Sequence, residues 1–338
     1  MIILLSSAVR RQYKEDILRS LAAPVGAKLR FRYRQDLIEP DLLGALDGAT
    51  ALICFIEEKT VGQKGVFVVP VREARIAAVH SHGSTRSIDL DLRGFVCAED
   101  EAEFQEALFR GRESAVPRFG DAARSDGSGQ FVFQLDDIPV LIRTDVSVSQ
   151  WEGVVARLAS RSAFSGEEYF WGVLGITEKA NRPQDTDSFS AAEKRKLLPG
   201  HYYRLLTYHY HPDADRSQTT TPPMAVTHGT GIEVQGPSEI AVESGYDLKE
   251  IAFKAVNDMP VTRHTWIRIG PKDRWSVGLE LRIRGARPWI SFLVIAVSLA
   301  APSTLLVFSD SMYVRVGGSL IAAICAAMAA VFGIRRGL

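Results

Sequence analysis

The segment KLRFRYR places basic side chains on alternate residues near the start of the chain. Successive side chains of a β-strand point to opposite faces, so this pattern predicts a strand with one cationic face and one apolar face. Such a face suits a phosphate-rich ligand, a nucleic-acid backbone, an acidic partner or an anionic membrane surface. The candidate anion-binding residues are Lys28, Arg30, Arg32 and Arg34.

A structural interpretation of this cationic segment stays open beside the functional one. Four like charges at close spacing repel one another, and proteins place such charges on edge strands to block pairing with other chains. Acidic residues on other expected strands, Asp89 and Asp91 among them, show no sign of the enclosed setting that acid–base catalysis requires.

Two histidine pairs have a spacing that suits a metal site. His209 and His211 in YHYHPDAD share one face of an expected strand, with Asp213 and Asp215 close behind, and these are ligand types of zinc or manganese. They alternate with tyrosines, so a wet sheet face is the alternative. A second pair, in VHSHGS, is followed at once by glycine and favours a hairpin turn. We predict no metal or cofactor and keep His209 and His211 as the weak metal candidates.

The chain lacks the common signatures of catalysis. The first expected strand leads into SSAVRR rather than a glycine loop, and no G-x-S-x-G or H-E-x-x-H segment is present. The three cysteines, Cys54, Cys97 and Cys325, have no metal or disulfide spacing. Lys+Arg and Asp+Glu both number 40, so no global basic field exists for nucleic acid. The sequence leaves enzymatic activity uncertain and leans against it.

Two uncharged apolar stretches close the sequence, at about 289–308 and 316–334. Each is long enough to cross about 30 Å of hydrocarbon, so we expect a transmembrane hairpin over residues 288–335. Basic residues flank its outer ends, which places both ends in the cytoplasm. A buried helical hairpin is the alternative. The expected membrane-interface residues are Arg282, Arg284, Arg287, Trp289, Arg335 and Arg336.

Small residues recur at every fourth position of the second expected span. They would form a smooth ridge that lets two helices approach closely in lipid. The ridge suits packing on the first span within one chain, and it equally suits association between chains. The expected helix-packing residues are Gly318, Ala322, Ala326 and Ala330.

Ahead of this tail the sequence predicts two soluble domains. Residues 1–118 mix strand and helix patterns and suggest an α+β domain, and the Gly/Ser-rich residues 119–130 suggest a linker. Residues 131–286 are rich in aromatic and branched strand segments and suggest a mainly-β, sandwich-like domain. Within it, Ser149 and Glu152 form a capping-box pattern that predicts a helix containing Trp151.

The layout as a whole is similar to that of bacterial membrane effectors of antiphage or abortive-infection systems. The similarity is one of architecture and covers no specific residues. It implies cytoplasmic sensing domains, self-association and a hairpin that perturbs the bacterial inner membrane. The expected partners are the lipid bilayer, a second copy of the chain or a partner membrane protein, and an anionic ligand, while nucleic acid is not expected. A membrane-anchored binding or scaffold protein with a passive anchor is the alternative, followed by a tethered enzyme.

Overall fold

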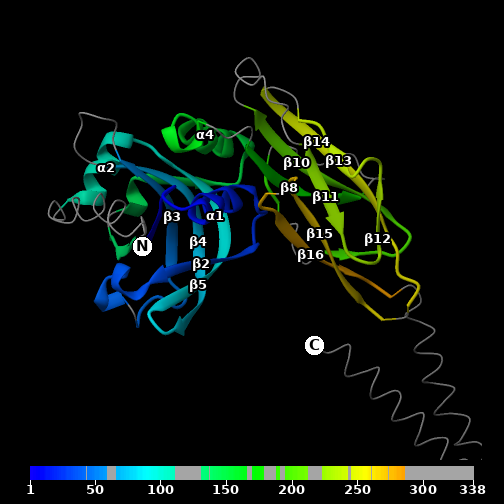
Figure 1. Ribbon diagram of the computed structural model, residues 1–338, viewed down its shortest axis with the longest axis horizontal. Coiled ribbons are helices and arrows are strands. Elements are labelled where there is room, and N and C mark those ends of the chain that lie inside the picture. The colour runs from blue at the N-terminus through cyan, green and yellow to red at the C-terminus, as the bar shows by residue number, and fades with distance from the viewer. Residues whose placement is uncertain are drawn as a thin grey trace, which may run out of the picture.

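The computed structural model describes residues 1–42, 44–58, 66–110, 131–136, 138–165, 170–178, 188–190, 195–211, 223–242, 245–259, 261–272 and 274–285. Within these residues the chain forms two units, the first built on one sheet and the second on two (Figure 1). Strands make up more than half of the described residues, and three α-helices accompany them there.

The first unit is a seven-stranded sheet in the order β2-β5-β4-β3-β1-β6, in which β7 also pairs with β5. β1 runs parallel to β3, and the other pairs are antiparallel. The strands are β1 (Ile2–Ser6), β2 (Lys28–Arg34), β3 (Thr50–Glu58), β4 (Val66–His82), β5 (Thr85–Ala98), β6 (Phe131–Gln134) and β7 (Ile142–Asp145). The helices are α1 (Arg11–Ala22), α2 (Glu101–Phe109) and α4 (Val148–Ala159), with 3-10 turns η1 (Gln35–Leu37), η2 (Pro40–Leu42), η3 (Ile138–Val140) and η4 (Ser162–Phe164).

Helices cover both faces of this sheet, so alternate residues of its central strands are buried on opposite sides. Leu4 and Ile53 belong to the core under α1 and α4, whereas Ile3 and Leu52 belong to the core under α2. In Figure 1, α1 crosses in front of β3 and β4. Burial on both faces explains why β1 is a continuous apolar run rather than an alternating one.

A buried arginine fixes the C-terminal end of α1 against the sheet. Arg72 on β4 is fully buried, and its guanidinium donates to the backbone carbonyls of Ser20 (2.6 Å), Ala23 (2.5 Å) and Arg93 (2.7 Å). The guanidinium carbon also lies 4.3 Å from the ring centroid of Phe95. Burial lowers the pKa of Arg72 to about 9, so it stays protonated at neutral pH. Its charge complements the negative end of the helix dipole.

The first unit continues past the linker suggested by the sequence. β6 pairs with β1, β7 pairs with β5, and α4 packs over the same sheet. Residues 131–159 therefore complete the first sheet and its helical cover rather than opening the second unit. The expected linker, 119–130, lies outside the described residues.

The second unit consists of a four-stranded sheet in the order β12-β14-β10-β8 and a five-stranded sheet in the order β13-β11-β15-β16-β9. Inward residues of both sheets, such as Phe253 and Leu279, belong to one core, which is consistent with the expected sandwich. The strands are β8 (Phe170–Glu178), β9 (Lys196–Leu197), β10 (Tyr202–His211), β11 (Met224–His228), β12 (Ile232–Gln235), β13 (Glu239–Ile240), β14 (Gly245–Ala255), β15 (Arg263–Pro271) and β16 (Val277–Ile283).

The two units share a continuous hydrophobic core. Trp151 of α4 packs edge-on against Tyr208 of β10, with ring centroids 5.5 Å apart, and the rings of Phe164 and Phe170 lie 6.0 Å apart. The Tyr208 hydroxyl also donates to the Glu152 carboxylate at 2.6 Å. These contacts hold the second unit in a defined position against α4 and η4.

The expected fold class needs correction. We predicted an α+β domain, a β-domain and a two-helix transmembrane hairpin, whereas the described structure as a whole is mostly β, with three α-helices packed on the first sheet. Among the helices of the described residues, none combines the length and apolar character needed to cross a bilayer, so the structure does not show the hairpin. The expected spans lie outside the described residues, together with Arg287, Trp289, Gly318, Ala322, Ala326, Ala330, Arg335 and Arg336. Arg282 lies within β16, and Arg284 follows it.

Candidate functional site

The cationic segment forms strand β2, and acidic residues of its neighbours accompany its cations. β2 lies at the edge of the described sheet and pairs only with β5 there. Arg30 donates two hydrogen bonds to Asp89, at 2.6 Å and 2.9 Å. Lys28 lies opposite Asp91, with the amine 3.9 Å from the carboxylate. The edge position agrees with the structural interpretation of the segment, whereas the opposing carboxylates of β5 were not part of that interpretation.

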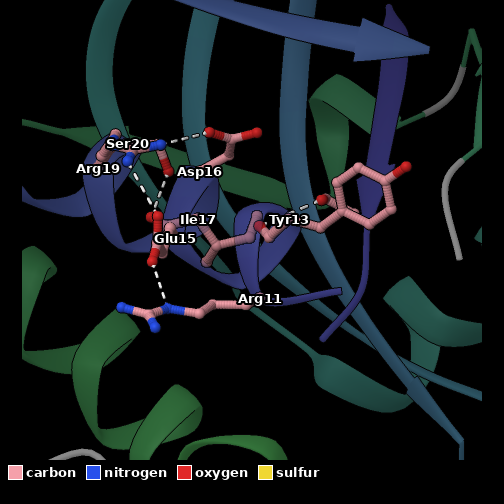
Figure 2. A network of polar contacts seen from close by, with 8 residues as sticks. Arg11, Tyr13, Glu15, Asp16, Ile17, Arg19 and Ser20 are labelled. Carbon is pink, nitrogen blue, oxygen red and sulfur yellow. Dashed lines mark hydrogen bonds and ion pairs between the residues drawn. The ribbon is translucent and has the colours of Figure 1, made fainter. Parts of the chain in front are cut away.

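The other two cations of β2 also lie near carboxylates. Arg34 bonds to Asp36 two residues along the chain. Burial raises the pKa of Asp16 on α1 to about 6. The positive charge of Arg32 acts in the opposite direction and lowers this pKa by a smaller amount. Figure 2 shows Asp16 and Glu15 joined through Arg19 on this helix.

The two metal candidates lie inside the sandwich rather than on a wet face. His209 and His211 share one face of β10, as expected, and both are buried. The His209 ring lies 2.8 Å from the hydroxyl of Thr207, and burial lowers the pKa of His209 to about 4. Across the described residues, no three His, Cys, Asp or Glu side chains are grouped to hold a metal ion. The half-buried tyrosines between the histidines face the opposite side of the sheet, where Tyr208 and Tyr210 contact Tyr246.

The second histidine pair lies at a hairpin turn, as expected. β4 ends at His82 and β5 begins at Thr85, with Gly83 in the left-handed region at φ 59°. His80 lies 3.2 Å from the same Asp89 carboxylate that binds Arg30. Together with Arg30, it holds the pKa of Asp89 below its usual value.

A cleft of about 720 Å³ lies where β2 of the first unit meets strands β15 and β16 of the second. Lys28 lines it from the first unit. The alternating residues His264, Trp266 and Arg268 line it from β15, and β16 contributes Gly278 and Glu280; Thr265 completes the lining. The odd residues Thr265, Ile267 and Ile269 of β15 face the sandwich core, so the alternation of one strand builds both the core and the cleft.

The cleft combines an aromatic ring with groups of both charges. Trp266 is 38% exposed, and the guanidinium of Arg268 lies 4.9 Å from the centroid of its ring. Glu280 lies directly opposite Trp266 in the register of β15 and β16. Within the described residues, the side chains of Glu280 and His264 form neither a hydrogen bond nor an ion pair. These groups are therefore free to contact a ligand.

An unsatisfied buried group adjoins this cleft. The Thr265 hydroxyl is buried and has no hydrogen-bond partner within the described residues. A Cβ atom on Gly229 would lie 2.9 Å from this oxygen and 3.0 Å from the indole nitrogen of Trp266. Glycine at this position therefore lets the main chain approach both polar atoms. An orphaned buried hydroxyl costs about 1–3 kcal/mol, so Thr265 is a locally destabilising feature of β15.

Gly278 keeps the floor of the cleft open. A Cβ built on this residue meets no atom within 4 Å, although the residue is the second of strand β16 and pairs with Arg268 of β15. Glycine weakens a strand interior and often marks the close approach of a ligand or another backbone. Here no other backbone is close, so the missing side chain leaves room in the cleft.

Sequence reasoning identified Lys28 but missed the rest of the cleft. The signal was present in RHTWIRI, where a tryptophan stands between a histidine and an arginine on the polar face of a strand. A single exposed Trp is common on protein surfaces and does not by itself indicate a binding site. The cleft also requires Lys28, which lies about 240 residues before Arg268 in the sequence, so local sequence patterns could not bring the two together.

Comparisons with known proteins assign no function to this cleft. No family model matches the chain, and no curated protein matches it. A structure of Bacteroides ovatus GH5 xyloglucanase in complex with a XXXG heptasaccharide is 11% identical over 28% of this chain and 18% of that chain, with a TM-score of 0.19. Secreted serine protease VesC from Vibrio cholerae is 9% identical over 72% of this chain and 65% of that chain, with a TM-score of 0.20. The chain spans less than two thirds of either structure, and similarity at this level supports no inference about fold or function.

Proposed function

We propose that the described part of this protein is a ligand-binding module that takes a small anionic molecule in the cleft between β2 and β15–β16. The observation that carries the proposal is the convergence of Lys28 and Arg268, from opposite units, on one cleft that also holds an exposed Trp266. Pockets for small molecules combine an apolar surface with a few convergent polar groups in this way.

The charges of the cleft favour an anion. Lys28 and Arg268 contribute two positive charges against one negative charge from Glu280, which leaves a net of +1 from these three residues. Lys28 is 56% exposed and lies 3.9 Å from Asp91, a distance beyond that of a hydrogen bond. An exposed ion pair of this kind contributes little, so an anion can replace it at small cost.

The architecture supplies a preformed site. The two units share one core through Trp151, Tyr208, Phe164 and Phe170, which fixes the walls of the cleft before a ligand arrives. A volume of about 720 Å³ lies within the range of about 300–1,000 Å³ typical of small-molecule sites. Binding therefore requires no large rearrangement of the two units.

Calorimetric titration of the purified full-length chain with inorganic pyrophosphate tests the proposal. Lys28→Gln and Arg268→Gln should each weaken binding by roughly tenfold, the size expected for losing one charge-assisted contact. Arg30→Gln is the matched control, because it removes a cation from the same strand outside the cleft lining. Equal losses in all three variants, or no binding to the unmodified chain, would contradict the proposal.

The membrane role inferred from the sequence stays a prediction. Localisation at the inner membrane, self-association and bilayer perturbation all depend on residues outside the described part of the chain. Fractionation of expressing cells tests the localisation, since recovery of the chain with the soluble fraction would exclude it. Dye uptake by the same cells separates an effector that admits dye from a passive anchor that does not.

A further inference from the structure

We infer that the end of the sandwich where β16 terminates is a binding face for an anionic lipid surface. Three parts of the chain form this end: residues 195–202, which lead into β10; residues 256–259 and 261–263, which join β14 to β15; and residues 282–284 at the end of β16. We call them the basal face. The basal face shares no residue with the lining of the cleft, so the inference goes beyond the proposed ligand binding and does not depend on it.

Hydrogen bonds tie the three parts of the basal face together. The Arg284 amide donates to the Leu197 carbonyl at 2.9 Å. Asn257 is buried, and its side-chain amide donates to the carbonyls of Val261 (2.9 Å), Ile283 (3.3 Å) and Arg284 (2.9 Å). A buried amide satisfied in this way holds the turns beside it in one arrangement. The side chains on these turns therefore form a defined surface.

Cations at the basal face lack the carboxylates that accompany the cations of β2. In the strand register, Arg282 lies between Lys196 of β9 and His264 of β15, and neighbouring like charges repel one another. Glu280 follows on the same face of β16, yet no ion pair joins it to Arg282 within the described residues. An anionic surface would relieve this repulsion. One carboxylate, that of Asp258, belongs to the described basal face, against the five cations Arg195, Lys196, Arg263, Arg282 and Arg284.

Exposed apolar side chains stand among these cations. Leu198 is 36% exposed, Tyr202 is 43% exposed and Met259 is 52% exposed. Three of the eight large hydrophobic residues that are exposed in the described part of the chain thus lie at this one end. Met259 belongs to the turn held by Asn257, since its amide donates to the Asn257 side-chain oxygen at 3.1 Å. Leu198 begins a second turn, in which its carbonyl accepts from the His201 amide.

This combination favours a lipid surface over a protein partner. Proteins that bind a membrane surface place apolar side chains at the boundary of the headgroups and acyl chains, while their cations attract anionic lipids. A protein interface instead has a contiguous apolar centre with few charges. The apolar residues of the basal face are single side chains separated by cations. In the sequence, the uncharged apolar stretch 289–308 also follows shortly after this face.

Flotation of the purified full-length chain with lipid vesicles tests the role of the cations. Vesicles that mix phosphatidylcholine with phosphatidylglycerol should bind the chain more tightly than vesicles of phosphatidylcholine alone. Lys196→Gln combined with Arg284→Gln should weaken binding to the anionic vesicles by roughly tenfold or more, because each cation near an anionic surface contributes about fivefold. Arg75→Gln combined with Arg143→Gln makes the same change of charge at exposed sites of the first unit and should weaken binding far less. Equal losses in the two double variants, or equal binding to both kinds of vesicle, would overturn the inference.

Leu198→Ser combined with Met259→Ser tests the role of the apolar side chains. This variant should weaken binding to the anionic vesicles by roughly tenfold, whereas Leu248→Ser combined with Val140→Ser, at exposed sites elsewhere, should not. No substituted residue lines the cleft, so an unchanged thermal midpoint and pyrophosphate affinity separate loss of lipid contact from loss of the fold or of the proposed function. Self-association that Leu198→Ser and Met259→Ser abolish while vesicle binding persists would identify a protein interface and overturn the inference.

Discussion

Arg30 on the edge strand β2 makes a two-bond ion pair with Asp89 on the neighbouring strand β5, through nitrogens 2.6 Å and 2.9 Å from the two carboxylate oxygens. The pair joins residues 59 positions apart in sequence. It shows that basic residues of an edge strand can be neutralised by the opposite strand, since Asp89 and Asp91 of β5 supply countercharges to Arg30 and Lys28.

This neutralisation predicts a gain of anion affinity when the carboxylates are removed. The double variant Asp89→Asn, Asp91→Asn should elute from a heparin column at clearly higher salt than the unmodified chain, because Lys28 and Arg30 lose their anionic partners. Glu233→Gln combined with Asp258→Asn makes the same change of charge at exposed carboxylates outside these ion pairs and should shift elution less. Equal shifts in the two double variants would show that net charge alone determines the elution position, and would contradict a specific effect of freeing Lys28 and Arg30.

Filling the cleft should abolish binding without harming the fold. A Cβ on Gly278 meets no atom within 4 Å, so Gly278→Phe places its ring in the cleft, and a larger side chain favours the strand conformation. We expect pyrophosphate affinity to fall at least tenfold, with an unchanged thermal midpoint. Gly270→Ala is the contrasting variant, because its Cβ would lie 2.3 Å from the carbonyl oxygen of Trp275 and should lower the midpoint. Retained affinity in Gly278→Phe would place the ligand elsewhere.

Arg72 should be among the most sensitive core positions of the first unit. Arg72→Met leaves three backbone carbonyls without their donor, and each unsatisfied buried group costs about 1–3 kcal/mol. The free energy of unfolding, measured by urea titration, should therefore fall by about 3 kcal/mol or more. Arg93→Met removes an exposed ion pair with Glu73 and should cost less than about 1 kcal/mol. Similar losses in both would contradict the anchoring role of Arg72.

His209 should make the protein sensitive to mild acid. Burial lowers the pKa of His209 from 6.5 to about 4. Between these pH values the imidazole is protonated in the unfolded chain and neutral in the folded chain. The contribution of neutral His209 to the free energy of unfolding is fully present above the unfolded pKa of about 6.5 and is lost as pH falls towards 4. Between pH 7 and pH 5 the free energy of unfolding should fall by roughly 2 kcal/mol. Urea titrations at both pH values should show a smaller loss in His209→Gln. The exposed His228→Gln should behave as the unmodified chain, and a His209→Gln loss as large would refute the prediction.

Asp16 should have the opposite dependence on pH. Its pKa is raised from 3.8 to about 6, so the folded state favours the protonated acid and loses stability as pH rises from about 4 to 6. Asp16→Asn should therefore be more stable than the unmodified chain at pH 7, by at most about 3 kcal/mol, and should show no advantage at pH 4. The same substitution at the exposed Asp258 should have no such dependence. An Asp16→Asn variant less stable at pH 7 would show that its ion pair with Arg19 dominates.

Local periodicity was a good guide to individual strands and a poor guide to their neighbours. The alternation in KLRFRYR correctly placed Phe31 and Tyr33 in the core. The alternation could not predict the contact between Arg30 and Asp89, because the register of a strand pair depends on packing across the whole sheet. The same limit applies to His209, whose shared face with His211 was clear but whose burial depends on a second sheet.

Helix α4 was predicted correctly from the sequence, but the hydrogen bonds of its capping residues were not. The helix was expected from a capping box of Ser149 and Glu152, yet Ser147 provides the cap by accepting from the amide of Gln150. Glu152 is instead bound by the Tyr208 hydroxyl from the other unit. The cleft could not be predicted for a similar reason, because its lining residues come from β2 near the start of the chain and from β15 and β16 more than 230 residues later.

Strand β1 has a consequence for how the chain is synthesised. It lies between β3 and β6, so Ile2–Leu5 are paired on both sides only when residues 131–134 are present. At about 5–20 residues per second, a ribosome needs on the order of 10 s to reach β6 after β1 emerges. During that interval the apolar segment IILLS has an unpaired edge, which is a natural substrate for chaperones that shield nascent chains. The first sheet can therefore be completed only after β6 and β7 have been synthesised.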